Sequence, residues 1–162
     1  MIELIVVVVI IGILSSIAIP SFQNASDKAR QKEASVLVNA YQKGAESYFI
    51  DYGSTPSLSS HIGEYVSVIG CSSFNATKCA NDPHKNLSKY GHQQWLTLNR
   101  LFSIRITTTN SHVWITATPA GDYKDKGYGV VTCFNMETGA KRINNLIVRG
   151  HREVVRKSSR AW

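Results

Sequence analysis

The sequence lacks three short motifs that indicate common catalytic chemistries. It has no Gly-x-Ser-x-Gly nucleophile elbow, no phosphate-binding Gly-x4-Gly-Lys-Ser/Thr loop and no His-Glu-x-x-His zinc helix. It also contains no internal repeat and no low-complexity tract. We therefore expect a protein that is not an enzyme and that has no nucleotide site of its own.

Charge is absent from a long stretch near the N-terminus. From Leu4 to Ile19 there is no charged residue, and the polar side chains in this run are those of Ser15 and Ser16. As a helix the run spans about 24 Å, or about 28 Å counted from the start of the chain, close to the ~30 Å hydrocarbon core of a bilayer. A signal peptide fits poorly, because no Lys or Arg precedes the run and no Ala-x-Ala-like cleavage site follows it. We interpret the run as a membrane-spanning half-helix.

Net positive charge is nearly absent outside the C-terminal end. The formal net charge is +7, and residues 141–162 carry seven basic residues against Glu153, a net +6 that leaves +1 for the other 140 residues. A basic tail ending in Trp could hold DNA through phosphate charge and stacking. The alternatives are a solvated tail without a partner and contact with an anionic surface or a neighbouring subunit. The candidate residues for an anionic ligand are Arg149, Arg152, Arg156, Lys157, Arg160 and Trp162.

Cysteine is scarce, and all three cysteines lie outside the apolar run. In an exported domain the odd count predicts one disulfide and one free thiol. Cys71 with Cys79 is the favoured pair because it closes a short loop of seven intervening residues, and Cys133 in place of one partner is the alternative. Zinc on Cys71, Cys79, His84 and His92 is disfavoured, because these spacings miss the usual pattern. We predict no metal and no cofactor.

A helical pattern continues past Pro20 to about Tyr52. Two apolar stripes recur at spacings of three and four, and Gly53, followed by Ser-Thr-Pro, is a stop signal. One helix of this length would measure roughly 80 Å, far more than the diameter of the domain that the rest of the chain can form. Its first half must project, and an apolar projecting half needs lipid or copies of itself.

The second half of the chain has the alternation of β-strands. Strong alternation predicts strands at Phe102–Thr109 and Val113–Thr118. A further strand is expected at Tyr128–Phe134, after a loop rich in Gly, Asp and Lys, and weaker patterns occur at Lys141–Ile147 and Tyr65–Ile69. We expect an antiparallel meander of three or four strands whose apolar face covers the second half of the long helix, an α+β arrangement. Residues 72–94, rich in Asn, Ser, Lys and His, are interpreted as a long surface loop.

The N-terminal segment resembles that of a known family. Met-Ile-Glu-Leu-Ile-Val-Val-Val-Val-Ile-Ile-Gly-Ile-Leu-Ser-Ser-Ile-Ala-Ile-Pro-Ser-Phe (Met1 to Phe22) is similar to the N-terminal segment of type IV pilins and the related pseudopilins. Glu3, Gly12 and Pro20 all fall at the family's spacing, and residues 28–34 resemble the continuation in many pilins, cyanobacterial ones among them. The resemblance implies a pilin fold, with a transmembrane first half-helix and a second half-helix packed on the sheet.

The resemblance also implies a role for each matched position. Glu3 corresponds to the acid that pairs with the N-terminal amine of an adjacent subunit and sets the register of assembly. The alternative is an acid at headgroup level favoured by the helix dipole. Gly12 and Pro20 correspond to positions where the helix bends, although Pro20 could also be only a kink beyond the membrane. Because the family pattern begins two residues before Met1, after a basic leader, we expect the true start to lie upstream.

The function implied by the resemblance is that of a structural subunit of a type IV pilus-like filament, supporting adhesion, motility or DNA uptake. Its implied partners are other copies of the chain, the cytoplasmic membrane, a prepilin peptidase and a pilus assembly platform, with DNA a weaker candidate. We expect a single-pass inner-membrane protein that then enters an extracellular pilus. A minor pilin or a type II secretion pseudopilin is one alternative, and a membrane-anchored ligand-binding protein is another.

The expected organisation has four parts. A transmembrane and polymerisation half-helix (1–20) is followed by an amphipathic half-helix (21–53), a globular loop plus antiparallel sheet (54–150) and a basic C-terminal tail (151–162).

Overall fold

The computed structural model describes residues 2–72, 79, 85–109 and 111–149. Its helices are α1 (Ile2–Tyr52), α2 (Ser59–Gly63) and the short 3-10 helices η1 (Leu87–Lys89) and η2 (Gly121–Tyr123). Its strands are β1 (Ile69–Gly70), β2 (Lys85–Asn86), β3 (Gln94–Leu96), β4 (Phe102–Thr108), β5 (His112–Pro119), β6 (Tyr128–Asn135) and β7 (Lys141–Arg149). The predicted α+β class is confirmed.

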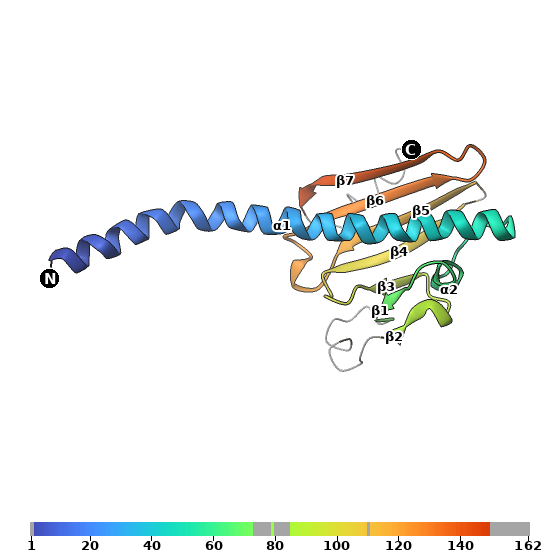
Figure 1. The fold of residues 1–162 in the computed structure, drawn as a ribbon, viewed down its shortest axis with the longest axis horizontal. Helices are drawn as coiled ribbons and strands as arrows, with labels where there is room; N and C mark the ends of the chain where they lie inside the picture. The colour runs from blue at the N-terminus through green and yellow to red at the C-terminus, as the bar shows by residue number, and fades with distance from the viewer. Residues whose placement is uncertain (1, 73–78, 80–84, 110, 150–162) are drawn as a thin grey trace.

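Helix α1 is a single element that runs through Pro20 without a break and ends where the sequence predicts. Gly53 adopts a φ of 63°, and its N–H donates to the carbonyl of Phe49 at 2.8 Å. Glycine takes this left-handed conformation without steric cost, so the chain can leave the helix there. In Figure 1 the second half of α1 crosses one face of the sheet, and the first half extends beyond the domain along a gentle curve.

The main sheet has five antiparallel strands in the order β3-β4-β5-β6-β7. Four of them correspond to the strong and weak patterns after Phe102, so the expected number of three or four strands is wrong by one. The additional strand is β3, which pairs Trp95 with Ile104. Three residues are too few for an alternating pattern to stand out.

Two other expectations are wrong in part. Tyr65–Ile69 is not a strand: the N–H groups of Tyr65 and Val66 both donate to the carbonyl of Ile62, which extends the turn of α2, and β1 begins only at Ile69. Within the predicted surface loop the described part contains β2 and η1, whose Leu87 is 1 % exposed. The polar composition of residues 72–94 gives no indication that Leu87 is buried in the core.

The core lies between α1 and the sheet. The second half of α1 contributes Ala34, Val38, Tyr41 and Ala45, all fully or almost fully buried. Trp95 is completely buried and meets the Tyr41 ring edge to face at 5.6 Å. The sheet contributes alternate residues, among them Ile104, Ile106, Val113, Ile115, Val130 and Phe134. The helix is therefore held along its second half only.

Candidate functional site

The first half of α1 is an apolar surface that nothing in the described chain covers. From Ile2 to Ala25 every residue is exposed except the half-buried Ser15, with Ile2 at 78 % and Phe22 at 75 %. Among the described residues α1 is the helix long and apolar enough to cross a membrane, judged by length and composition. An exposed surface of this size indicates a partner, either lipid or protein.

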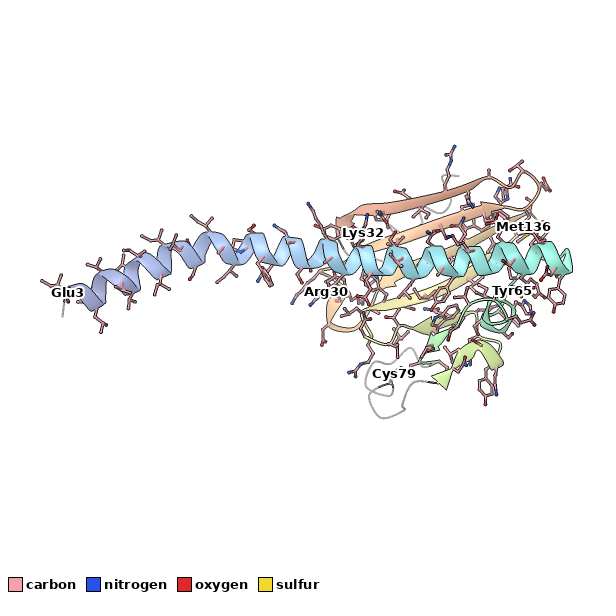
Figure 2. The ribbon with its side chains drawn as sticks, in the orientation of Figure 1. Glu3, Arg30, Lys32, Tyr65, Cys79 and Met136 are labelled. Carbon is pink, nitrogen blue, oxygen red and sulfur yellow. A yellow bond between two sulfur atoms is a disulfide. The ribbon has the colours of Figure 1, made fainter. Side chains whose placement is uncertain are left out.

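Polar groups within this half are few, and their positions keep the desolvation cost of burying them in an apolar layer small. The hydroxyl of Ser16 donates to the carbonyl of Ile13 at 2.7 Å, which satisfies it inside the helix. Glu3 lies in the first turn, at the extreme end of the projecting helix in Figure 2, where the helix dipole favours a negative charge. The role of Glu3 in setting the register of assembly stays a prediction.

Gly12 and Pro20 both lie inside the unbroken projecting helix. Nothing lies within 4 Å of the position that a Cβ at Gly12 would take, so this glycine is not required by packing within the chain. Pro20 removes one helical hydrogen bond in a segment that has no neighbour to brace it. Their role in bending stays a prediction.

The junction between the two halves of α1 is fixed by side chains that reach from the helix to the sheet. The Gln31 amide donates to the carbonyls of Gly129 and Leu146 at 3.1 and 2.8 Å, and so joins the helix to β6 and β7. The hydroxyl of Tyr123 donates to the carbonyl of Asp27 at 3.1 Å. Burial, reinforced by Asp27, raises the pKa of Tyr123 to about 12. These contacts set the direction in which the first half projects.

Comparison with known proteins identifies relatives that match part of the chain. A fimbrial protein of Neisseria meningitidis is 32% identical over 63 residues, which cover 39% of this chain and 37% of that protein. A type IV major pilin, PilE, of Neisseria gonorrhoeae is 28% identical over 95 residues, or 53% of this chain and 57% of the pilin. The chain is related to the type IV pilins. It spans less than two thirds of the length of these relatives, and no family model and no solved structure gives a significant match.

In this pilin relative Cys71 and Cys79 form a disulfide, as expected. Cys71 also exchanges two backbone hydrogen bonds with Leu96, at 2.9 and 3.0 Å, and the two cysteines and Leu96 form a small buried cluster. Cys133 on β6 is a free, buried thiol. The disulfide therefore fastens the start of the segment after β1 to the edge of the main sheet at β3.

The other predicted site residues are the candidates for an anionic ligand at the C-terminal end of the chain. Arg149 ends β7, whereas Arg152, Arg156, Lys157, Arg160 and Trp162 lie outside the described residues. No group of three or more His, Cys, Asp or Glu within the described ranges could hold a metal ion.

Sequence analysis missed the junction residues Gln31 and Tyr123. Gln31 occurs among other polar residues of a helix, and its carbonyl partners are backbone groups about a hundred residues away. No local sequence pattern predicts a contact between residues so far apart in the chain.

Proposed function

We propose that this pilin relative is a structural subunit of a type IV pilus-like filament. The observation that carries the proposal is the exposed apolar half-helix with an acid in its first turn, projecting from a folded α+β domain. The names of the relatives, fimbrial protein and type IV major pilin, support it. In this proposal residues 1–20 form the transmembrane and polymerisation unit, 21–53 the amphipathic half-helix, 54–150 the globular part and 151–162 a basic tail.

The physical reason for polymerisation is the cost of exposing the apolar half-helix to water. Burying one Val, Leu or Ile side chain is worth about 1.5–3 kcal/mol, and this helix carries an unbroken series of them from Leu4 to Leu14 except at Gly12. In the cytoplasmic membrane lipid buries them. When the subunit leaves the membrane for an extracellular filament, only the half-helices of other copies can take the place of lipid.

The proposed filament needs other proteins for its assembly. The chain has no phosphate-binding loop, so the energy for assembly comes from a separate assembly platform. A prepilin peptidase would process the encoded start. The filament would support adhesion, motility or DNA uptake, with DNA the weakest of the proposed partners.

The test separates a polymerising subunit from a simple anchor through Glu3. In an anchor, Glu3→Ala removes a desolvation cost and changes nothing downstream. In a filament, loss of a charge that pairs in a low-dielectric layer is expensive, so we expect normal levels in the membrane and an about tenfold or greater loss from sheared filaments. Membrane and sheared fractions of cells producing the natural gene product would be blotted in parallel.

The matched control is Glu46→Ala. Glu46 lies on the same helix and accepts from Lys141 at 3.4 Å in an exposed ion pair, which is worth at most about 1 kcal/mol. This variant should enter filaments normally. Equal amounts of wild type and Glu3→Ala in the sheared fraction would refute the assembly role of Glu3.

A further inference from the structure

Three basic residues surround α1 where its first half leaves the domain. Lys28, Arg30 and Lys32 are all exposed. Residues four apart on a helix share a face and residues two apart do not, so Lys28 and Lys32 lie together and Arg30 lies on the other side. Figure 2 shows Arg30 and Lys32 on opposite sides of α1, at the end of the domain nearest the projecting half. We refer to Lys28, Arg30 and Lys32 as the basic collar.

The acids near the basic collar offset only part of its charge. Asp27 is 9 % exposed, so it contributes little to the surface. Glu33 lies farther from the projecting half than the collar residues do, and it accepts a hydrogen bond from the amide of Asn99 at 3.0 Å. The neighbouring loop, residues 121–127, carries two Lys and two Asp and has no net charge. The exposed charges of α1 next to the projecting half are therefore mainly positive.

Distances along α1 place the basic collar at the surface of a membrane that the first half spans. The twenty steps from Ile2 to Phe22 measure about 30 Å, the thickness of the hydrocarbon core. Lys28 then lies about 9 Å and Lys32 about 15 Å beyond that core, whereas the headgroup layer is about 5–8 Å deep on each side. Helical side chains tilt toward the N-terminus, so the long collar side chains lean back toward the headgroups. From Leu4 to Ser26 no charged residue occurs.

Contacts with the sheet and its loops fix the basic collar to the domain. The guanidinium of Arg30 lies over the ring of Tyr123, 5.2 Å from its centroid, and the hydroxyl of Tyr123 donates to the carbonyl of Asp27. Gln31, inside the collar, joins α1 to β6 and β7. A guanidinium is a planar fork of donors that suits phosphate oxygens. The collar is thus a preformed group of cations that faces the membrane.

We propose that the basic collar binds the phosphate groups of anionic phospholipids at the membrane surface. An anionic lipid surface attracts Lys and Arg next to a transmembrane helix, and this attraction falls off within a Debye length. Charge complementarity selects this partner, because zwitterionic headgroups carry no net charge. The contact holds the domain at the bilayer surface. The proposal rests on the membrane-spanning half-helix of the proposed function and not on filament formation.

Electron paramagnetic resonance of spin-labelled lipids tests the proposal on the full chain reconstituted in phosphatidylcholine vesicles. Lipids that contact a transmembrane helix are motionally restricted, so the restricted fractions of labelled phosphatidylglycerol and labelled phosphatidylcholine give a headgroup preference ratio. At about 0.01 M salt, where the Debye length is ~30 Å, we expect a ratio of about three or more in favour of phosphatidylglycerol. The ratio should fall toward one at about 1 M salt, where the Debye length is ~3 Å.

A matched pair of variants separates the basic collar from net charge. The collar variant replaces all three collar residues by Gln. The distal variant, K43Q/K89Q/K141Q, removes the same charge from exposed residues on the second half of α1, on η1 and at the start of β7. The collar variant should lower the preference ratio to about half or less of the wild-type value, and the distal variant should keep it. Residues 150–162 are identical in all three proteins, so their charge does not affect the comparison.

A smaller change guards against a loss of folding. K28Q/K32Q leaves Arg30 on Tyr123, so it should lower the preference ratio at an unchanged thermal unfolding midpoint, and K28R/K32R should keep the wild-type ratio. Equal ratios for the collar and distal variants would overturn the proposal. Restricted lipid without a preference in the wild type would refute the collar as a lipid site and leave the spanning half-helix in place. Absence of restricted lipid would refute both.

Discussion

The two halves of α1 are one continuous helix, yet they stand in opposite relations to the rest of the chain. In the second half Ala34, Val38 and Ala45 are completely buried by the sheet. In the first half the larger side chains of Ile2 and Leu4 are 78 % and 71 % exposed. The half with the more apolar sequence thus contributes least to the folded domain, which shows that apolar content alone does not place a residue in a core.

The difference has a cause in side-chain size. The second half presents small residues, Ala34, Gly44 and Ala45, where the sheet and α2 approach closely. The first half is dense in branched residues on all sides, which suits lipid or other helices but leaves no preferred face for a sheet. We therefore expect the stability of the domain to depend on the second half and to be insensitive to the first.

The largest expected effect comes from removing the side chain that fills the space beneath the second half. Trp95→Ala should lower the free energy of unfolding by about 3–5 kcal/mol, because Trp95 is fully buried against Tyr41. Ile10→Ala, in the exposed half, should leave it unchanged. Urea unfolding in detergent, followed by the fluorescence of the remaining tryptophans, measures both, and a comparable loss for Ile10→Ala would show that the halves are not independent.

A pair of glycines on α1 gives a finer comparison. At Gly44 a Cβ would lie 2.9 Å from Ile62 Cγ2 and 3.1 Å from Val66 Cγ2, so Gly44→Ala should cost about 1–3 kcal/mol of strain, partly offset by better helix propensity. At Gly12 there is no neighbour, and Gly12→Ala should not alter the unfolding of the domain. The same urea titration decides it. A lower free energy of unfolding for Gly12→Ala would contradict the expectation that domain stability is independent of the first half of α1.

The smallest effect is a pH dependence at the junction of the halves. Tyr123 has a raised pKa of about 12, against an ordinary value of 10.0, so the folded state keeps this proton longer than the unfolded state does. Its contribution to stability is complete below about pH 10 and is lost as the pH rises toward 12. Tyr123→Phe should lower stability by about 1 kcal/mol at neutral pH, through loss of the hydrogen bond to Asp27, and should flatten the decline above pH 10.

Thermal unfolding between about pH 8 and pH 11 measures this decline. The control is Tyr90→Phe, which removes a phenol that is 59 % exposed. Its curve should coincide with that of the wild type. If Tyr123→Phe gave the same slope as the wild type above pH 10, Tyr123 would not be responsible for the decline.

Much of the fold could be predicted because its signals are local. The stop at Gly53 depends on one residue, and β4 and β5 each alternate over at least seven residues. What could not be predicted depends on distant partners. Trp95 is central to the core, but its strand has three residues and follows a polar stretch.

The candidate site also contains some features that the sequence predicts and others that depend on distant partners. The apolar half-helix and Glu3 are contiguous and visible in the sequence, whereas Gln31 acts on the carbonyls of Gly129 and Leu146, which only the folded topology brings near. The pairing of Cys71 with Cys79 was accessible because the two residues are close in sequence.

The attachment of α1 along the sheet has a mechanical consequence. If tension is applied along the projecting half, it enters the domain at Asp27 and Gln31 and runs parallel to the helix axis, through side chains packed as far as Ala45. Such a load shears the whole interface at once and does not peel strands away one after another. The contacts then share the force, and the domain should resist a pull along α1 better than an equal pull across it. The disulfide at Cys71 and Cys79 lies outside this load path, at the β3 edge of the sheet.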